Sequence, residues 1–484
     1  MDTSNIIKNL YKLKETMPDL IIKKINYGIL KDIYIITIDT VSSGDRINDF
    51  ILKYFGNKNT SNNKNNKLKK EITDYVPAIN EKEPKDYNEL LEYLFNGFTA
   101  LIHKNNMYCF ETKASIDRGV TEPSSEPVTR GPKDSFNENY NTNIGLIRKR
   151  IKSKNLCIKE LIVGKESKTK VAVFYMDNIC DINVANNIIK DIENINIDGV
   201  LDTSYIKELI KNQNHTLFPT MINSEKPDDT SKALLDGKIV VMMENSPNVI
   251  LLPTFFIDFF QNGEDFYRKP FFISFVRIIR LLSFYISIFL PGFFLALLTY
   301  NQEIIPTSLL INFAAQRNNV PFPALIELTL LLVIFEIIYE GDARTPSSRG
   351  TSLSILGALV LGESAVSAGL ISQIMVIVVA ISSMSSLITI FQEMQSSIRF
   401  WRYLTMILVT LFGIIGFYVS AALLLINLCT IKSYEKPYLL PFAPFDKESQ
   451  NNALIRRNLK KIKYRKRYLA KKNIIRNNTK DSEI

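Results

Sequence analysis

The chain has 484 residues, a formal net charge of +10 and a hydrophobic fraction of 46%. The first ~270 residues have the composition of soluble protein, whereas residues 271–431 carry apolar stretches long enough to cross a hydrocarbon layer of ~30 Å. Because 13 Lys/Arg against 4 Asp/Glu lie in residues 446–484, beside the last apolar stretch, the basic charge favours cytoplasmic retention and attraction to anionic lipid and argues against nucleic-acid binding.

The first predicted subdomain covers residues 1–125. Its N-terminus lacks a basic start followed by an apolar run, so no secretory signal is expected and the region should stay in the cytoplasm. Alternating apolar residues predict strands over Ile33–Ile38 and Met107–Thr112, and helical spacing predicts a helix over Tyr87–Asn96. A stretch rich in Asn and Lys predicts a disordered insertion near 56–70. These elements indicate a small α/β subdomain.

A second α/β subdomain is predicted over residues 126–270. The polar, proline-containing stretch from Thr121 to Pro132 reads as the linker between the two subdomains. A helix, a strand, a second helix and a hairpin follow, over Asn143–Lys152, Val171–Met176, Val184–Ile192 and Lys238–Leu252. The hairpin is expected to close the subdomain just before the membrane.

A transmembrane helical domain is predicted over residues 271–431, followed by a basic cytoplasmic tail over 432–484. Its apolar segments lie at about 281–300, 322–340, 351–371, 372–391 and 403–430. Ile304–Ala315 is shorter and is expected to be interfacial or re-entrant. A basic tail inside favours an even number of crossings, and the glycine-interrupted 351–371 is the first candidate for an incomplete one. The predicted fold class is therefore an α+β or α/β N-terminal region of two subdomains followed by an α-helical transmembrane bundle.

Catalytic and metal-binding patterns are weak. The four cysteines show no C-x-x-C spacing and the only histidines are His103 and His215, which predicts neither a zinc site nor a disulfide framework. Gly164-Lys165-Glu166-Ser167 is similar to the end of a phosphate-binding loop, but Lys159 stands where the loop's first glycine would be. The sequence therefore predicts no enzyme, no cofactor and no catalytic, cofactor-binding or metal-binding residue.

Several specific blocks stand in a fixed order along the chain. They are Thr129-Arg130-Gly131-Pro132, Leu234-Leu235-Asp236-Gly237-Lys238, Ile305-Pro306-Thr307, Val320-Pro321-Phe322-Pro323 and the proline-rich run from Lys436 to Phe445. With these blocks the chain resembles the A-subunit family of GerA-type spore germinant receptors over roughly residues 120–445. It departs from the family pattern at Glu340–Pro346, where relatives have an Arg-Leu-Pro turn, and at Glu363, where they often have Gln.

The resemblance implies a function and partners. It implies a subunit in the spore inner membrane that works with a transporter-like B subunit and a lipoprotein C subunit. It also implies a homo-oligomeric ring whose membrane helices form a nutrient-gated cation channel, with the N-terminal region and the C-terminal tail on the core side. Neither the partner subunits nor the channel-forming ring follows from composition or periodicity.

Three carboxylates fall inside apolar segments, where an ionisable side chain costs ~2.5–3.5 kcal/mol on insertion scales. They are Glu327, Glu336 and Glu363. One hypothesis places Glu363 or Glu336 against water or a permeating cation. The other pairs the carboxylates with Arg344, Arg349 or backbone donors inside the bundle, and for Glu327 and Glu336 this second hypothesis is favoured because buried charges are usually paired.

The 372–391 segment carries a stripe of hydroxyl residues on one helical face, continued by two apolar residues. The stripe consists of Ser382, Ser385, Ser386, Thr389, Met375 and Val378. A hydroxyl face followed by an apolar constriction suits a pore that closes by dewetting, whereas small hydroxyl residues also let helices pack closely. The residues alone support pore lining and helix packing equally, and the family resemblance favours pore lining.

Cationic residues outside the spans have simpler interpretations. Arg268, Lys269, Arg277 and Arg280 flank the first span, where snorkelling to the cytoplasmic surface is expected. Arg130 is a candidate subunit contact, although an ordinary surface ion pair also explains it.

Two alternative functions stay open. One is a non-conducting scaffold that relays a signal within the germination complex. The other is a secondary transporter, against which the lack of paired inverted repeats argues. The family also includes an A-like subunit of a separate amplifying complex, and neither the germinant nor the ring size can be derived from the sequence.

Overall fold

The computed structural model describes residues 3–27, 30–53, 81–104, 106–114, 130–210, 216–318, 320–344, 362–388, 391–450 and 452–477. The chain divides into two compact units. The sheet unit contains residues 1–214, 221–253 and 460–484, and the helical unit contains residues 215–220 and 254–459. The predicted insertion at 56–70, most of the 121–132 linker and the first part of the 351–371 segment lie outside the described residues.

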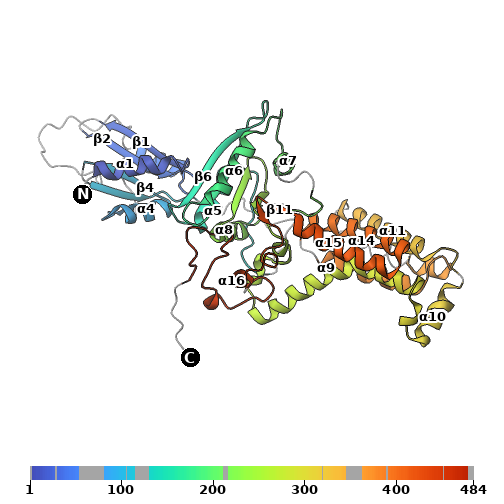
Figure 1. The fold of residues 1–484 in the computed structure, drawn as a ribbon. Helices are drawn as coiled ribbons and strands as arrows, with labels where there is room; N and C mark the ends of the chain where they lie inside the picture. The colour runs from blue at the N-terminus through green and yellow to red at the C-terminus, as the bar shows by residue number, and fades with distance from the viewer. Residues whose placement is uncertain are drawn as a thin grey trace, which may run out of the picture. The chain divides into compact units, whose positions relative to one another are not determined.

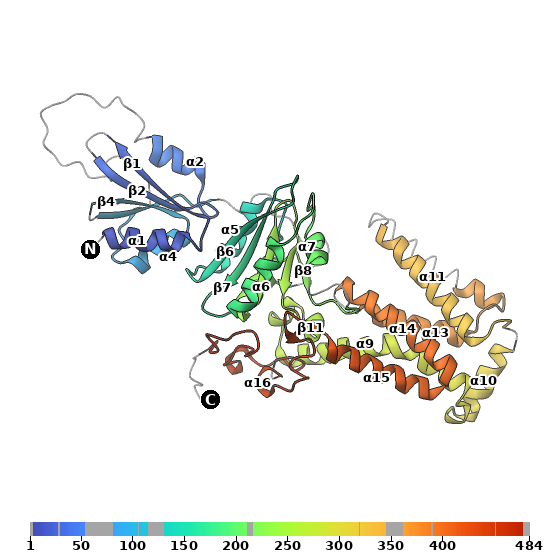
Figure 2. The same cartoon turned by 45° about the horizontal axis from the view of Figure 1, so that its top comes forward.

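The first subdomain of the sheet unit is a five-stranded antiparallel sheet in the order β1-β2-β4-β5-β3 (Figures 1 and 2). Its elements are α1 (Thr3–Lys14), β1 (Leu20–Tyr27), β2 (Leu30–Ile38), α2 (Gly44–Ile47), the π-helical turn η1 (Asn48–Leu52), β3 (Glu81–Lys82), α4 (Tyr87–Phe95), β4 (Phe98–His103) and β5 (Asn106–Glu111). Side chains alternate between the faces of the sheet. Ile36 and Ile38 pack in a core with α1 and α4, whereas Ile33 and Ile35 pack with Ile51 of η1.

The second subdomain is another five-stranded antiparallel sheet, in the order β6-β7-β9-β10-β8. Its elements are α5 (Tyr140–Arg150), β6 (Leu156–Val163), β7 (Thr169–Met176), α6 (Ile182–Glu193), α7 (Thr203–Leu209), β8 (Ile222–Ser224), α8 (Pro227–Asp236), β9 (Ile239–Met243) and β10 (Val249–Leu252). Pro227 starts α8 and Gly237 ends it at a φ of 96°, which a residue with a side chain adopts at a cost. The predicted strands, helices and hairpin are confirmed to within three residues at each end.

A buried ion pair joins the two subdomains. Arg148 of α5 donates from Nε and Nη2 to the two carboxylate oxygens of Asp19, each at 3.0 Å, and both side chains are at most 4% exposed. The Thr40 hydroxyl donates to the same carboxylate at 3.1 Å. Such a fork-to-fork pair fixes orientation as well as distance.

The basic tail folds onto the second subdomain. The basic composition of the tail predicts attraction to anionic lipid, but three tail cations pair with aspartates of the sheet unit. The pairs are Lys471–Asp181 at 2.6 Å, Lys472–Asp177 at 3.3 Å and Arg476–Asp236 at 2.6 Å. Part of the tail charge is therefore neutralised within the chain.

Six helices are the main elements of the part of the helical unit that the structure describes (Figures 1 and 2). They are α9 (Pro270–Thr299), α10 (Thr307–Arg317), α11 (Ala324–Arg344), α13 (Gln373–Leu387), α14 (Gln392–Phe412) and α15 (Ile414–Thr430). Shorter pieces are η3 (Phe256–Phe260), η4 (Gly263–Phe266), η5 (Gln302–Ile304), β11 (Lys432–Ser433), β12 (Lys436–Pro437), α16 (Lys447–Gln450) and η6 (Leu459–Lys461). Helix α9 is the centre of the unit and contacts α11, α13, α14 and α15.

The prediction of one continuous apolar segment over 403–430 is wrong, because the chain turns at Gly413 between two helices. Gly413 separates α14 from α15 with φ 61° and ψ −140°, a backbone conformation open to glycine and strained for other residues. A Cβ on Gly416 would lie 2.0 Å from the Leu408 carbonyl oxygen, so the helices approach closely beside this turn. One apolar stretch therefore makes a helical hairpin.

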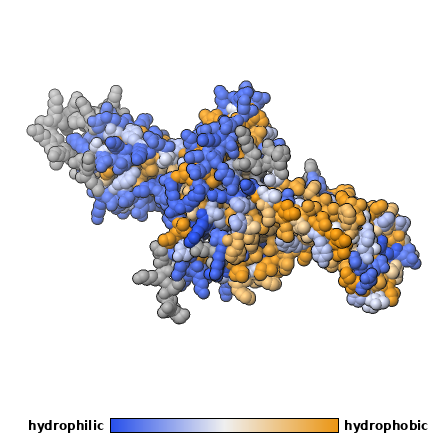
Figure 3. All heavy atoms as spheres, in the orientation of Figure 1, coloured by the Kyte–Doolittle hydropathy of each residue, from blue (hydrophilic) through white to orange (hydrophobic). Residues whose placement is uncertain are grey.

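Apolar side chains cover most of the visible face of the helical unit, and hydrophilic side chains gather at its far end (Figure 3). Many are widely exposed, including Phe271 at 91% and Ile415 and Tyr418 at 67% each. Among the described helices, α9 is the one that is both long and apolar enough to cross a membrane, while α13 and α15 are apolar but shorter. A soluble surface with this much exposed hydrocarbon is rare, so the unit needs an apolar environment or partner.

Candidate functional site

Helix α13 carries the predicted hydroxyl stripe, and it packs along α9 and α11. Met375, Val378, Ser382 and Ser385 are all less than 9% exposed, and Ser386 is half-buried. Thr389 lies outside the described residues. Within one chain, the stripe therefore contacts neighbouring helices, and the exposed face of α13 is the opposite one.

A proline in α9 creates a polar contact point for α13 and α14. Pro291 has no N–H, so it leaves the carbonyl four residues earlier, on Ser287, without its helical donor. The Ser382 hydroxyl of α13 donates to that carbonyl at 2.9 Å, and Arg402 Nε of α14 donates to it at 2.7 Å. Ser382 and Arg402 are 0% and 2% exposed. The Ser287 carbonyl, which lacks its donor within α9, thus joins α9, α13 and α14 in an apolar interior.

Glu336 lies close to this contact point. Its carboxylate pairs with Arg399 of α14 at 3.0 Å, with both side chains about one-third exposed. A cavity of about 20 Å³, room for a single water, is lined by Glu336, Arg399 and Arg402 together with Ser383 and Ser386 of α13. The partners predicted for Glu336 are Arg344, Arg349 or backbone donors inside the bundle. The side chain of Arg344 and all of Arg349 fall outside the description, and Arg399 takes this role.

Glu327 is bound to a backbone donor, one of the kinds of partner predicted for it, and also to a hydroxyl group and an arginine. The carboxylate is 1% exposed and accepts hydrogen bonds from the backbone N–H of Ser372 at 2.5 Å and from its hydroxyl at 2.6 Å. Ser372 is the residue before α13 begins, so Glu327 places a negative charge at the positive end of that helix. Arg317 of α10 approaches to 3.8 Å. Glu327 therefore connects α10, α11 and α13.

The remaining predicted residues lie apart from these contacts. Glu363 is exposed at the second described residue of a short helical stretch, and Arg130 is exposed at the edge of the region that the structure does not describe.

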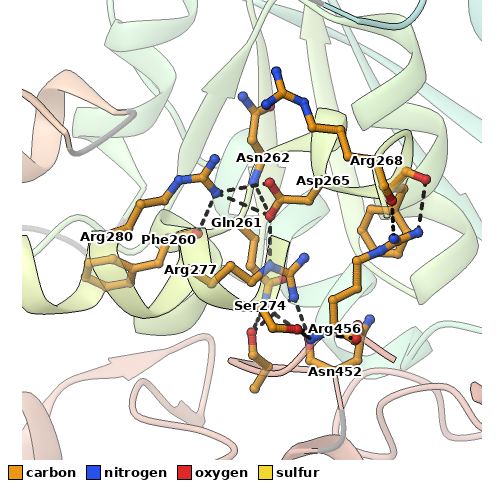
Figure 4. Close-up of polar contacts among 12 residues, drawn as sticks. Phe260, Gln261, Asn262, Asp265, Arg268, Ser274, Arg277, Arg280, Asn452 and Arg456 are labelled. Atoms are coloured by element: carbon orange, nitrogen blue, oxygen red, sulfur yellow. Dashed lines mark hydrogen bonds and ion pairs between the residues drawn. The ribbon is translucent and has the colours of Figure 1, made fainter. Parts of the chain in front are cut away.

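A second polar cluster, the Asp265 hub, lies at the start of α9 (Figure 4). Asp265 of η4 accepts from Arg277 Nε at 2.8 Å and pairs with Arg280 at 3.1 Å. Arg280 also donates to the Phe260 carbonyl at 3.1 Å. Arg277 and Asp265 are each 1% exposed, so the snorkelling predicted for Arg277 is wrong. The buried aspartate holds this guanidinium inside the protein.

The segment after α16 completes the hub. Arg277 Nη1 donates to the carbonyls of Asn452 and Ala453 at 3.0 and 3.2 Å. Arg456 donates to the Phe266 carbonyl at 3.0 Å and lies over the Phe266 ring at 5.3 Å. These contacts attach residues 452–456 to the base of α9, about 180 residues away in sequence, which local sequence patterns cannot predict.

Comparisons with known proteins agree with the resemblance. A family model described as Bacillus/Clostridium GerA spore germination protein matches residues 6–468. Spore germination protein KA of Bacillus subtilis (strain 168) is 37% identical over 385 residues, which are 79% of this chain and 70% of that protein. Spore germination protein GerQA of Bacillus cereus is 33% identical over 80% of this chain and 78% of that protein.

Two further similarities extend the comparison. The membrane protein YfkQ of Bacillus subtilis (strain 168), whose function is uncharacterised, is 29% identical over 93% of this chain and 88% of that protein. The crystal structure of the N-terminal domain of the A subunit of the Bacillus megaterium spore germinant receptor GerK3 is 27% identical, covers 51% of this chain and 93% of that chain, and aligns with a TM-score of 0.39.

Proposed function

This chain belongs to the Bacillus/Clostridium GerA spore germination protein family, and on that premise we propose that it is the A subunit of a nutrient germinant receptor in the spore inner membrane. The proposed partners are further copies of itself, a transporter-like B subunit and a lipoprotein C subunit. The proposed activity is a nutrient-gated cation path through the helical units. No catalytic role is proposed.

The turn at Gly413 supports a multi-pass arrangement. The end of α9 and this turn are adjacent, because a Cβ on Gly413 would lie 3.0 Å from the Tyr300 ring. The start of α13 is bound to Glu327 near the start of α11. If α9, α11, the 351–371 segment, α13, α14 and α15 all cross, the count is even and the tail lies on the same side as the N-terminal region, as its basic charge favours. No incomplete crossing is then required.

The observation that carries the channel proposal is the polar interior beside α13. Ser382, Ser383, Ser386, Glu336 and two arginines lie together within an otherwise apolar unit. Because Met375, Val378 and Ser385 are buried in the arrangement described, conduction along the stripe requires α13 to rotate away from α9. The Ser382 bond to the Ser287 carbonyl would oppose that rotation.

The test is ion release from spores that carry Ser385→Leu or Val378→Ala, with and without nutrient and at matched receptor levels. The control is Ile377→Ala, on the exposed face of the same helix, where the side chain is 52% exposed. We expect leucine to block release, or alanine to make it constitutive, while the control behaves as the parent. Normal release from both variants would contradict the pore assignment.

A non-conducting scaffold is the second candidate, and the burial of the stripe is the observation that favours it. In that case α13 is a packing helix, and the hub and the docked tail transmit a signal instead. Normal ion release from the stripe variants together with loss of germination in Asp265→Asn would support the scaffold.

A further inference from the structure

The Asp265 hub contains more positive than negative charge. Arg277 and Arg280 both pair with the single carboxylate of Asp265, and Arg456 lies in the same cluster. Their other partners are backbone carbonyls, which carry only partial charge. Buried charges in proteins are normally paired, so within the described part of the chain these three guanidinium groups carry more positive charge than the Asp265 carboxylate balances.

Two guanidinium nitrogens of the hub are also unused. Arg277 is 0% exposed and Arg456 is 5% exposed. Arg277 Nη2 and Arg456 Nε have no hydrogen-bond partner among the residues that the structure describes. A buried donor without an acceptor is costly and uncommon. Arg268 and Arg280 keep 35% and 15% of their side chains exposed, so the cluster can be reached from water.

The hub's position relates it to the lipid surface. Helix α9 has 30 residues and is therefore about 45 Å long, which exceeds the ~30 Å thickness of a hydrocarbon layer. Its first turns, which carry Arg277 and Arg280, would therefore lie at the level of lipid headgroups. On the outside of these turns Phe271, Phe272 and Phe275 are 91%, 53% and 59% exposed, an apolar surface of the kind that enters the boundary between headgroups and acyl chains.

We propose that the Asp265 hub binds the phosphate of an anionic ligand, either an anionic phospholipid headgroup or a soluble phosphate. Phosphate oxygens accept from guanidinium forks, and the anion supplies the missing charge between Arg277, Arg280 and Arg456. Occupancy would tie the segment around Asn452 and Arg456 to the base of α9 through the shared anion. The proposal does not depend on ion conduction.

The experiment measures thermal unfolding of the full-length protein in neutral detergent during three titrations, with short-chain phosphatidylglycerol, short-chain phosphatidylcholine and inorganic phosphate. We expect a saturable rise in Tm with phosphatidylglycerol and not with phosphatidylcholine if the source is a lipid headgroup. An equal rise with inorganic phosphate would assign the site to a soluble phosphate. No saturable response to either anion would overturn the proposal.

Variants show whether the hub is the site. Arg280→Gln and Arg456→Gln should weaken the apparent affinity for the responding anion about tenfold or more, because each removes a charged donor. Lys269→Gln removes an exposed cation from the residue next to α9 and should change affinity less than twofold. If a glutamine variant does not fold, Arg280→Lys keeps the charge but loses the fork, and it should bind with intermediate affinity. Unchanged affinity in the hub variants that fold would overturn the proposal.

Discussion

The Ser287 carbonyl permits a prediction in which three substitutions must interact. Ser382→Ala removes one donor and should cost about 1 kcal/mol of stability. Arg402→Met removes the other donor, a charged one, and should cost about 1.5–3 kcal/mol. Each single variant leaves the carbonyl one partner, but the double variant leaves it with none in an apolar interior. The double variant should therefore lose about 1–3 kcal/mol more than the sum of the single variants.

The proline gives the internal control. Pro291→Ala restores an N–H that can donate to the Ser287 carbonyl within α9, so in that background the extra loss of the double variant should disappear. Unfolding of the purified proteins in mixed micelles, followed by circular dichroism, is measured for the parent and for the seven variants that combine these three substitutions. Ser420→Ala is the matched control, because that buried hydroxyl bonds only within α15, to the Phe417 carbonyl. Equal coupling with and without Pro291 would refute the reasoning.

Three further outcomes are expected. Asp19→Asn should lower the unfolding free energy by about 3–5 kcal/mol, because it leaves the Arg148 guanidinium buried without its counter-ion. The control Asp39→Asn, at an exposed position, should change the unfolding free energy by less than about 0.5 kcal/mol. Equal urea midpoints for the two variants would contradict the prediction. Glu327→Gln should lower Tm by several degrees, because it removes the negative charge at the start of α13. Glu363→Gln, at an exposed position, should leave Tm unchanged. An equal drop in Tm in both variants would show that the position of Glu327 at the helix start is unimportant. Burial raises the pKa of Cys109 from 9.0 to about 12, so as pH rises this thiol ionises in the unfolded chain before it ionises in the folded protein. The contribution of Cys109 to the free energy of unfolding is therefore complete below pH 9 and is lost as pH rises toward 12. Cys109→Ala should make the free energy of unfolding less dependent on pH between these values.

Local sequence patterns located several elements of the sheet unit. Alternation in Ile33–Ile38 and helical spacing in Tyr87–Asn96 locate β2 and α4, because each has one face toward a core. The antiparallel order of the strands does not follow from these patterns, since strand pairing joins residues far apart in sequence.

The sequence was less informative about the helical unit. Gly413 sits in a continuous apolar stretch, and composition gives no sign that it adopts a positive φ. Pro291 was a usable signal, because a proline inside a helix always frees the carbonyl four residues earlier. Its donors, Ser382 and Arg402, could not be named without the packing of α13 and α14. Asp265 was missed for a similar reason, since it binds Arg277 across a turn and its other neighbours lie near residue 452.

The division of the chain affects any attempt to isolate its parts. Residues 460–477 belong to the sheet unit although 206 residues of the helical unit, 254–459, separate them from Pro253. A fragment that stops at residue 253 would lose the tail and leave the acidic side chains of Asp177, Asp181 and Asp236 without the cations that pair with them. Binding of a basic ligand to such a fragment would report that uncovered surface, and co-expression with residues 460–484 is the appropriate way to study the sheet unit alone.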